Sequence, residues 1–193
     1  MEEKQGLPIR AVTSAQEWES WLADQHGAAR GVWLKLAKKR TGIDTVSYAE
    51  AVEAALCYGW IDGQGAAYDD TYWLQKFTPR GARSVWSKLN RVKAMELIAQ
   101  GRMAPAGIAA VEAAQRDGRW ERAYDPPSTA SVPEDFQRAL DANPTAAEFF
   151  ATLNRTNRYA MLYRIQDAKK PETRARRIDK FVQMLLRREK LYP

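Results

Sequence analysis

A run of cationic and polar side chains between positions 77 and 90 is the part of the sequence best equipped to do chemistry. It holds five residues where a helix is expected to begin: Arg80, Arg83, Ser84, Ser87 and Asn90. Free backbone N–H groups, the helix dipole, hydroxyl groups and guanidinium forks together make a site for an anion. The structural alternative is that the hydroxyl and amide groups only cap the helix, while the arginines pair with acids such as Asp62.

Asp62 is the acid that could work with these arginines on a small anionic substrate. It follows Trp60 and Ile61 in a segment that is expected to form a strand. Burial beside Trp60 would raise the pKa of the Asp62 carboxyl, whereas Arg80 or Arg83 would lower it. The sequence leaves the direction open, so a role for Asp62 as a general base is one hypothesis among several.

A second cationic cluster occupies residues 169–177, at the expected start of the last long helix. Helix starts favour acidic residues, so a cationic first turn is unfavourable unless it holds an anion or a carboxylate. Arg174 and Arg177 are therefore further candidates for binding an anionic ligand. The alternative is that Glu172 and Asp179 offset this charge and the arginines are simply solvated.

Metal and cofactor chemistry finds little support in this sequence. The chain has one histidine and one cysteine, too few for a zinc site, and we predict no metal site. It contains no phosphate-cradling loop and no dinucleotide fingerprint, so we predict no cofactor. Cys57 falls in the last turn of an expected helix, where the dipole disfavours a thiolate, and we expect a buried structural thiol. A binding role is therefore expected ahead of an enzymatic one.

The positive charge of the chain is concentrated near its C-terminus. The 193 residues carry a formal net charge of +6, and residues 155–193 hold 12 Lys or Arg against 4 Asp or Glu, a net charge of +8. A basic helix can meet nucleic acid, an anionic membrane or an acidic protein, or it can be a solvated face. The sequence contains no membrane-length apolar run and no signal-like N-terminus, so we expect a cytoplasmic location.

Periodicity predicts an α+β protein that is mostly helical. Capping-box patterns at residues 14–17, 47–50 and 145–148 predict helix starts, and strands are expected near residues 32–36, 60–63 and 72–77. We therefore predict a small three-stranded antiparallel sheet (βαββ-like) with packed helices and a helical C-terminal extension. The expected organisation is an α+β domain over residues 1–124, a linker or loop over 125–133, and a helical extension with a basic C-terminal helix over 134–193. A single domain is the alternative.

Several short motifs follow one another in order along nearly the whole chain. They include Gly31-Val32-Trp33-Leu34, Cys57-Tyr58-Gly59-Trp60-Ile61-Asp62-Gly63, Phe77-Thr78-Pro79-Arg80, Gly118-Arg119-Trp120 and Lys169-Lys170-Pro171-Glu172-Thr173-Arg174. On these motifs the chain resembles the YdeI/OmpD-associated family, also labelled bacteriocin-protection proteins. The resemblance implies a role in resistance to bacteriocins or cationic antimicrobial peptides and an outer-membrane porin as partner. It implies no particular catalytic residues.

Three functions remain open at this point. The first is a non-enzymatic binding protein for an anionic ligand or an acidic protein partner, acting in antimicrobial-peptide tolerance. The second is a nucleic-acid-binding protein that uses the basic C-terminal helices, with Tyr159 and Tyr163 stacking on bases. The third is an enzyme that acts on a small anionic substrate at the helix start between Arg80 and Asn90.

Overall fold

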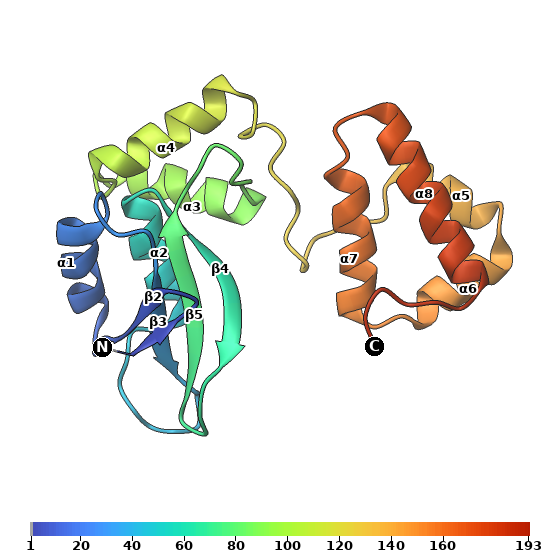
Figure 1. Ribbon diagram of the computed structural model, residues 1–193. Helices are drawn as coiled ribbons and strands as arrows, with labels where there is room; N and C mark the ends of the chain where they lie inside the picture. The colour runs from blue at the N-terminus through green and yellow to red at the C-terminus, as the bar shows by residue number, and fades with distance from the viewer. Residues whose placement is uncertain (1) are drawn as a thin grey trace. The chain divides into compact units, whose positions relative to one another are not determined.

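A computed structural model describes residues 2–193 of the chain, which divide into two compact units (Figure 1). Unit 1 contains residues 2–86 and Asn90–Ala123, and unit 2 contains Ser87–Leu89 and Tyr124–Pro193. The described residues form eight helices and five strands. The strands all belong to unit 1, so the two units differ in class.

Unit 1 is built on a mixed sheet in the order β1-β2-β3-β5-β4. Its strands are β1 (Glu3–Lys4), β2 (Leu7–Ala11), β3 (Val32–Ala37), β4 (Trp60–Ala67) and β5 (Tyr72–Pro79). Strands β2 and β3 run parallel, while the other neighbours are antiparallel. Helix α1 (Ala15–Gln25) connects the parallel pair, because two parallel strands need a crossover connection.

The predicted three-stranded antiparallel sheet is wrong. The three expected strands are present as β3, β4 and β5, but β1 and β2 extend them into a five-stranded mixed sheet. Strand β2 contains Pro8, which has no backbone N–H to donate, and β1 is only two residues long. Neither segment carries a strand signal of its own. Both depend on pairing, and β2 pairs with residues more than twenty positions further along the chain.

Helices α1 and α2 (Tyr48–Cys57) cover one face of this sheet. Their side chains join Val32, Leu34 and Leu36 of β3 in one hydrophobic core. Two of the three predicted helix starts are confirmed here: Ser14 accepts a hydrogen bond from the Glu17 N–H, and Ser47 forms a complete capping box with Glu50. These caps fix where each helix begins on the sheet.

A second core in unit 1 lies between α2, α3 (Lys88–Ala99) and α4 (Pro105–Arg116). Cys57 is buried in this core, as its position at the end of α2 predicts. Helix α4 approaches α2 closely at Gly107, where a Cβ atom would lie 2.3 Å from the Cys57 carbonyl oxygen. Only glycine allows this approach.

Unit 2 consists of four helices around a separate core. They are α5 (Glu134–Asp141), α6 (Pro144–Thr152), α7 (Arg155–Gln166) and α8 (Pro171–Leu186). The core is formed by residues from every helix, including Phe136, Phe150, Met161 and Phe181. The third predicted capping box is wrong, because α6 begins at Pro144 and residues 145–148 lie inside it. Proline at the first helical position fixes φ and sets the start earlier.

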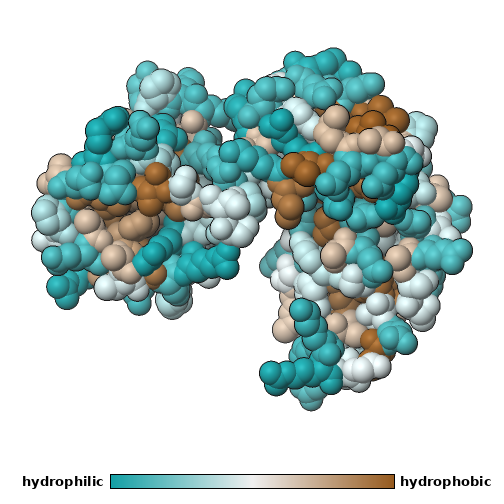
Figure 2. Space-filling view, turned by 180° about the vertical axis from the view of Figure 1, so that it is seen from behind, coloured by the Kyte–Doolittle hydropathy of each residue, from teal (hydrophilic) through white to brown (hydrophobic). Residues whose placement is uncertain are grey.

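The face of the molecule drawn in Figure 2 is mostly hydrophilic, and hydrophobic residues show in separate groups. Within residues 2–193, no helix combines the length and apolar character that crossing a membrane requires.

Candidate functional site

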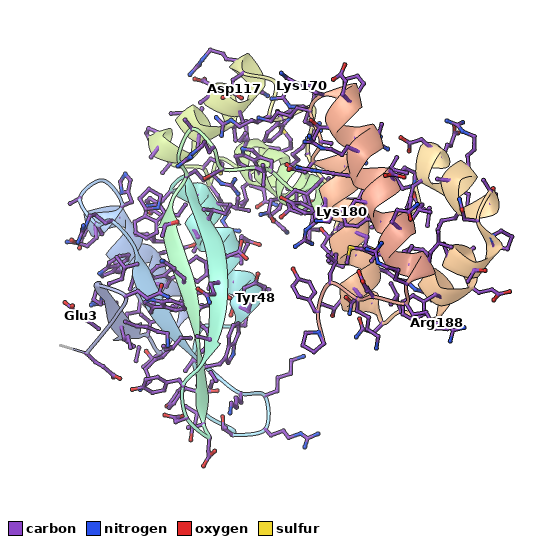
Figure 3. All side chains as sticks on the ribbon, turned by 45° about the vertical axis from the view of Figure 1, so that its right-hand side comes forward. Glu3, Tyr48, Asp117, Lys170, Lys180 and Arg188 are labelled. Carbon is purple, nitrogen blue, oxygen red and sulfur yellow. The ribbon has the colours of Figure 1, made fainter. Side chains whose placement is uncertain are left out.

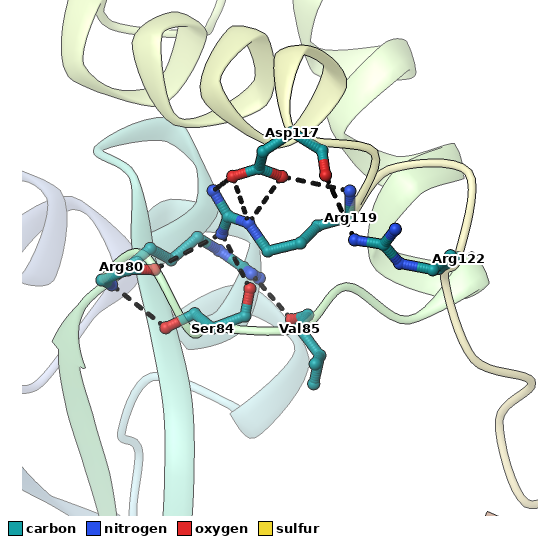
Figure 4. Close-up of polar contacts among 7 residues, drawn as sticks. Arg80, Ser84, Val85, Asp117, Arg119 and Arg122 are labelled. Atoms are coloured by element: carbon teal, nitrogen blue, oxygen red, sulfur yellow. Dashed lines mark hydrogen bonds and ion pairs between the residues drawn. The ribbon is translucent and has the colours of Figure 1, made fainter. Parts of the chain in front are cut away.

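The loop between β5 and α3 contains four of the predicted site residues, and internal contacts hold it tightly. The Arg80 guanidinium stacks on the Trp86 ring with 3.7 Å between its Cζ and the ring centroid, and its Nη1 donates to the Val85 carbonyl at 3.2 Å. The Ser84 Oγ accepts from the Gly81 N–H at 3.0 Å. Arg80 and Ser84 therefore shape the loop itself (Figure 4).

Arg119 completes this loop, and no role was predicted for it. Its Nη1 donates to the Ser84 carbonyl at 2.9 Å, while its Nε donates to both carboxylate oxygens of Asp117 at 2.9 and 2.8 Å (Figure 4). These hydrogen bonds from Arg119 lower the pKa of the Asp117 carboxyl. The sequence held a signal in the motif Gly118-Arg119-Trp120, but spacing alone could not connect it to a loop 35 residues earlier.

The remaining predicted residues of this region lie in different surroundings. Arg83 is exposed, Ser87 is buried, and Asn90 is half-buried in the first turn of α3. Asp62 on β4 accepts a hydrogen bond from the Tyr48 hydroxyl at 2.6 Å. Tyr48 begins α2 beside the sheet (Figure 3), so this hydrogen bond joins the start of α2 to β4. Asp62 is thus bound to the start of α2, whereas Arg80 contacts Val85 and Trp86 in the loop after β5.

The two arginines predicted in α8 both hold unit 2 together. The Arg174 guanidinium donates to both oxygens of Asp135 at 2.6 and 2.8 Å and to the Ile165 carbonyl at 3.0 Å. Arg177 donates to the Arg164 carbonyl and lies 3.5 Å from an Asp167 oxygen. Both therefore bind carbonyl groups at the C-terminal end of α7. The cationic start of α8 is therefore offset within the chain, because its arginines bind the Asp135 carboxylate and the carbonyl end of α7.

A cavity of about 580 Å³ lies along one face of α7. Thr156, Tyr159, Ala160 and Tyr163 fall at positions i, i+3, i+4 and i+7 and so share this face. The remaining lining residues are Pro127, Arg155, Arg164 and Tyr192. Helix α7 thus forms the floor, while the segment after Tyr124 and the C-terminal tail form walls. We call this feature the α7 cavity.

Both walls of the α7 cavity are fixed by hydrogen bonds. The buried Asn157 side chain accepts from the N–H groups of Leu191 and Tyr192 and donates to the Tyr192 carbonyl. On the other side the Tyr159 hydroxyl donates to the Asp125 carbonyl at 3.0 Å. The cavity is therefore preformed, which lowers the entropic cost of binding a ligand.

The lining of the α7 cavity is cationic and contains no carboxylate. Arg164 donates to two neutral groups, the Ala160 carbonyl at 2.9 Å and the Tyr192 hydroxyl at 3.0 Å. In the part of the chain that the structure describes, no carboxylate pairs with Arg155 or Arg164. Two guanidinium groups without counter-charges favour an anionic ligand.

Burial affects the pKa of two phenols in this cavity, those of Tyr159 and Tyr163. Burial raises the pKa of Tyr159 to about 12, and burial also raises the pKa of Tyr163. Both groups therefore stay protonated under physiological conditions. Such phenols bind and orient a ligand but do not accept a proton from it.

Metal and thiol chemistry have no matching site in residues 2–193. These residues contain no group of three or more His, Cys, Asp or Glu side chains placed to hold a metal ion. Burial raises the pKa of Cys57 to about 11, which disfavours its thiolate.

Two family models match the chain in different parts. Residues 10–110 match the model described as Domain of unknown function (DUF8412). Residues 129–188 match the model described as Bacteriocin-protection, YdeI or OmpD-Associated, which confirms the predicted resemblance for that segment and links it to bacteriocin protection. No match was found among curated proteins or among solved structures. The second segment contains six of the eight residues that line the α7 cavity.

Proposed function

We propose that this chain, which belongs to the family described as Domain of unknown function (DUF8412), is a binding protein for a small organic anion. The ligand occupies the α7 cavity, in the segment that matches the bacteriocin-protection model. One observation carries the proposal: a preformed cavity lined by three tyrosines and by two arginines that form no ion pair with a carboxylate of residues 2–193. Its volume of about 580 Å³ falls in the range typical of small-molecule sites.

The chemistry of the lining specifies the kind of ligand. Arg155 provides a guanidinium for a carboxylate or phosphate, and the phenols of Tyr159 and Tyr163 supply flat surfaces for an apolar or aromatic body. A cationic peptide would meet repulsion from Arg155 and Arg164. The proposed role in bacteriocin protection therefore works through an acidic ligand and not through direct capture of a cationic toxin.

Calorimetric titration with three compounds tests the binding site. Phenyl phosphate combines an anion with a ring, while inorganic phosphate and phenol each supply one part. We expect phenyl phosphate to bind most tightly. Arg155→Gln should weaken its binding about tenfold, because a hydrogen bond to a charged group contributes about 1.5 kcal/mol and each 1.4 kcal/mol is tenfold.

The matched control is Arg176→Gln, which removes the same charge from an exposed position of α8 outside the cavity lining. Equal weakening by both variants, or phenol binding as tightly as phenyl phosphate, would contradict the proposal. In cells, a gene deletion should raise bacteriocin sensitivity. The wild-type gene should restore protection, and the Arg155→Gln gene should not.

A further inference from the structure

The sheet of unit 1 has a second face, opposite α1 and α2, which we call the outer face. Side chains alternate along a strand, so Trp33 and Lys35 point away from the core residues Val32, Leu34 and Leu36. Directly paired residues of neighbouring strands share a face. Lys76 therefore accompanies Trp33, and Leu74 accompanies Lys35.

Three lysines on the outer face lie over aromatic rings. The Nζ atoms of Lys4 and Lys76 are 5.6 and 5.7 Å from the centroid of the Trp33 ring. The Lys35 Nζ is 4.2 Å from the Tyr68 ring and 4.9 Å from the Tyr72 ring. Trp33 is fully buried beneath this layer, whereas Tyr68 and Tyr72 are half-buried.

These ammonium groups contact aromatic rings, and Lys76 also donates to the Gln5 side-chain oxygen at 3.3 Å. No carboxylate in residues 2–193 forms an ion pair with Lys4, Lys35 or Lys76. The nearby Asp69 carboxylate accepts hydrogen bonds from the N–H groups of Tyr72 and Thr71, and these bonds, together with the charges of Lys35 and Lys38, lower its pKa. Contact with an aromatic ring stabilises a cation by only about 0.5–1 kcal/mol at an exposed site, so a phosphate is a better partner.

We propose that the outer face binds single-stranded nucleic acid. Lys4, Lys35 and Lys76 contact successive phosphates, and the rings of Tyr68 and Tyr72 stack with bases once Lys35 turns to the backbone. Sequence-tolerant single-strand binding combines cationic groups with aromatic side chains, because every base has a flat face. An acidic protein segment would pair with the lysines but would leave the rings unused. This proposal is independent of the α7 cavity.

Fluorescence anisotropy with a labelled thymidine oligonucleotide of about 12 residues tests the proposal on the full chain. Three phosphate contacts predict that log K falls with log salt concentration with a slope of about −2. The variant Lys4→Gln/Lys35→Gln/Lys76→Gln should weaken binding at least about tenfold and remove most of this slope. Tyr72→Leu should weaken binding about fivefold or more and leave the slope unchanged.

A matched triple variant, Lys169→Gln/Arg176→Gln/Lys180→Gln, removes the same charge from exposed positions in and before α8. It should bind like the wild type. Absence of oligonucleotide binding at low salt overturns the proposal. A loss of binding in this control variant alone also overturns it, because it would place binding on the C-terminal helices. Polyglutamate that competes as well as the oligonucleotide would also overturn it. Should the outer-face triple variant fail to fold, Lys35→Gln and Tyr72→Leu singly decide the same question.

Discussion

At the scale of single residues, the contacts separate arginines that build the fold from those that can reach a ligand. Arg80, Arg174 and Arg177 are all engaged by groups of their own unit. Residue type and spacing predicted that these arginines bind anionic or polar groups, but could not show whether those groups belong to a ligand or to the chain itself. Arg155 forms no ion pair with a carboxylate of residues 2–193, and its place in the α7 cavity depends on the packing of the C-terminal tail against α7.

Gly107 gives a prediction in which two effects oppose each other. Replacing glycine by alanine inside a helix normally stabilises it by up to about 1 kcal/mol. Here the new Cβ would lie 2.3 Å from the Cys57 carbonyl oxygen, a backbone atom that cannot move aside easily. Gly107→Ala should therefore destabilise unit 1 by about 1–3 kcal/mol.

Urea unfolding followed by tryptophan fluorescence measures this change, because all seven tryptophans lie in unit 1. Gly27→Ala is the control, since its Cβ would meet nothing within 4 Å. Its effect should stay within about 0.5 kcal/mol. A gain in stability for Gly107→Ala would show that α4 and α2 are not in close contact.

Tyr159 gives a prediction about high pH. Its pKa is raised to about 12 in the folded chain, above the value near 10 of a solvated phenol. A raised pKa adds stability that is complete below about pH 10 and is lost as the pH rises towards 12. Tyr159→Phe should flatten this pH dependence in thermal melts of the helical signal.

Absorbance of the phenolate, followed as the pH is raised, tests directly whether Tyr159 is the phenol with the raised pKa. The phenol that titrates near pH 12 should be missing in Tyr159→Phe and still present in the control Tyr68→Phe, which changes a residue in unit 1. A late step that survives in Tyr159→Phe would assign it to another tyrosine.

At the scale of elements, the helices and β3, β4 and β5 could be predicted because each carries its own local signal. Apolar periodicity marks their buried faces, and Ser47 with Glu50 marks the start of α2. Strands β1 and β2 could not be predicted, because β1 is only two residues long and pairs with β2, and β2 in turn depends on pairing with the distant strand β3. The α7 cavity escaped prediction for the same reason: its walls come from segments far from α7 in the sequence.

The contact between Arg174 and Asp135 predicts how α5, α7 and α8 stay together. The guanidinium joins all three helices through Asp135 and the Ile165 carbonyl. Arg174→Gln should destabilise unit 2 by about 1–2 kcal/mol, at the lower end for charged hydrogen bonds because the pair is partly exposed. Arg176→Gln, at an exposed position of the same helix, should change stability little.

The pH dependence of this effect has a defined sign. Hydrogen bonds from Arg174 lower the pKa of Asp135 in the folded chain. A lowered pKa adds stability above the unfolded value near 4 that is lost as the pH falls through the folded value. The difference between wild type and Arg174→Gln should therefore be full at neutral pH and shrink below about pH 4. A difference that stays constant on acidification would contradict an ionic contact.

At the scale of the whole molecule, the hydrophobic residues form separate cores. The core of unit 2 contains residues from Ala130 to Leu191 alone, whereas the cores of unit 1 end at Ala123. Separate cores favour separate cooperative transitions, since each unit gains its stability from its own buried contacts. We therefore expect urea unfolding curves from two spectroscopic signals not to coincide.

Tryptophan fluorescence reports unit 1 alone, while circular dichroism of helices reports both units, including the four helices of unit 2. Gly107→Ala should shift the midpoint of the fluorescence transition, which reports unit 1. The step in the circular dichroism curve that belongs to unit 2 should keep its midpoint. Arg174→Gln should do the reverse. Each variant thus serves as the control for the other. If each substitution moved both signals equally, the two units would unfold as one cooperative body, and stability in one would depend on packing in the other.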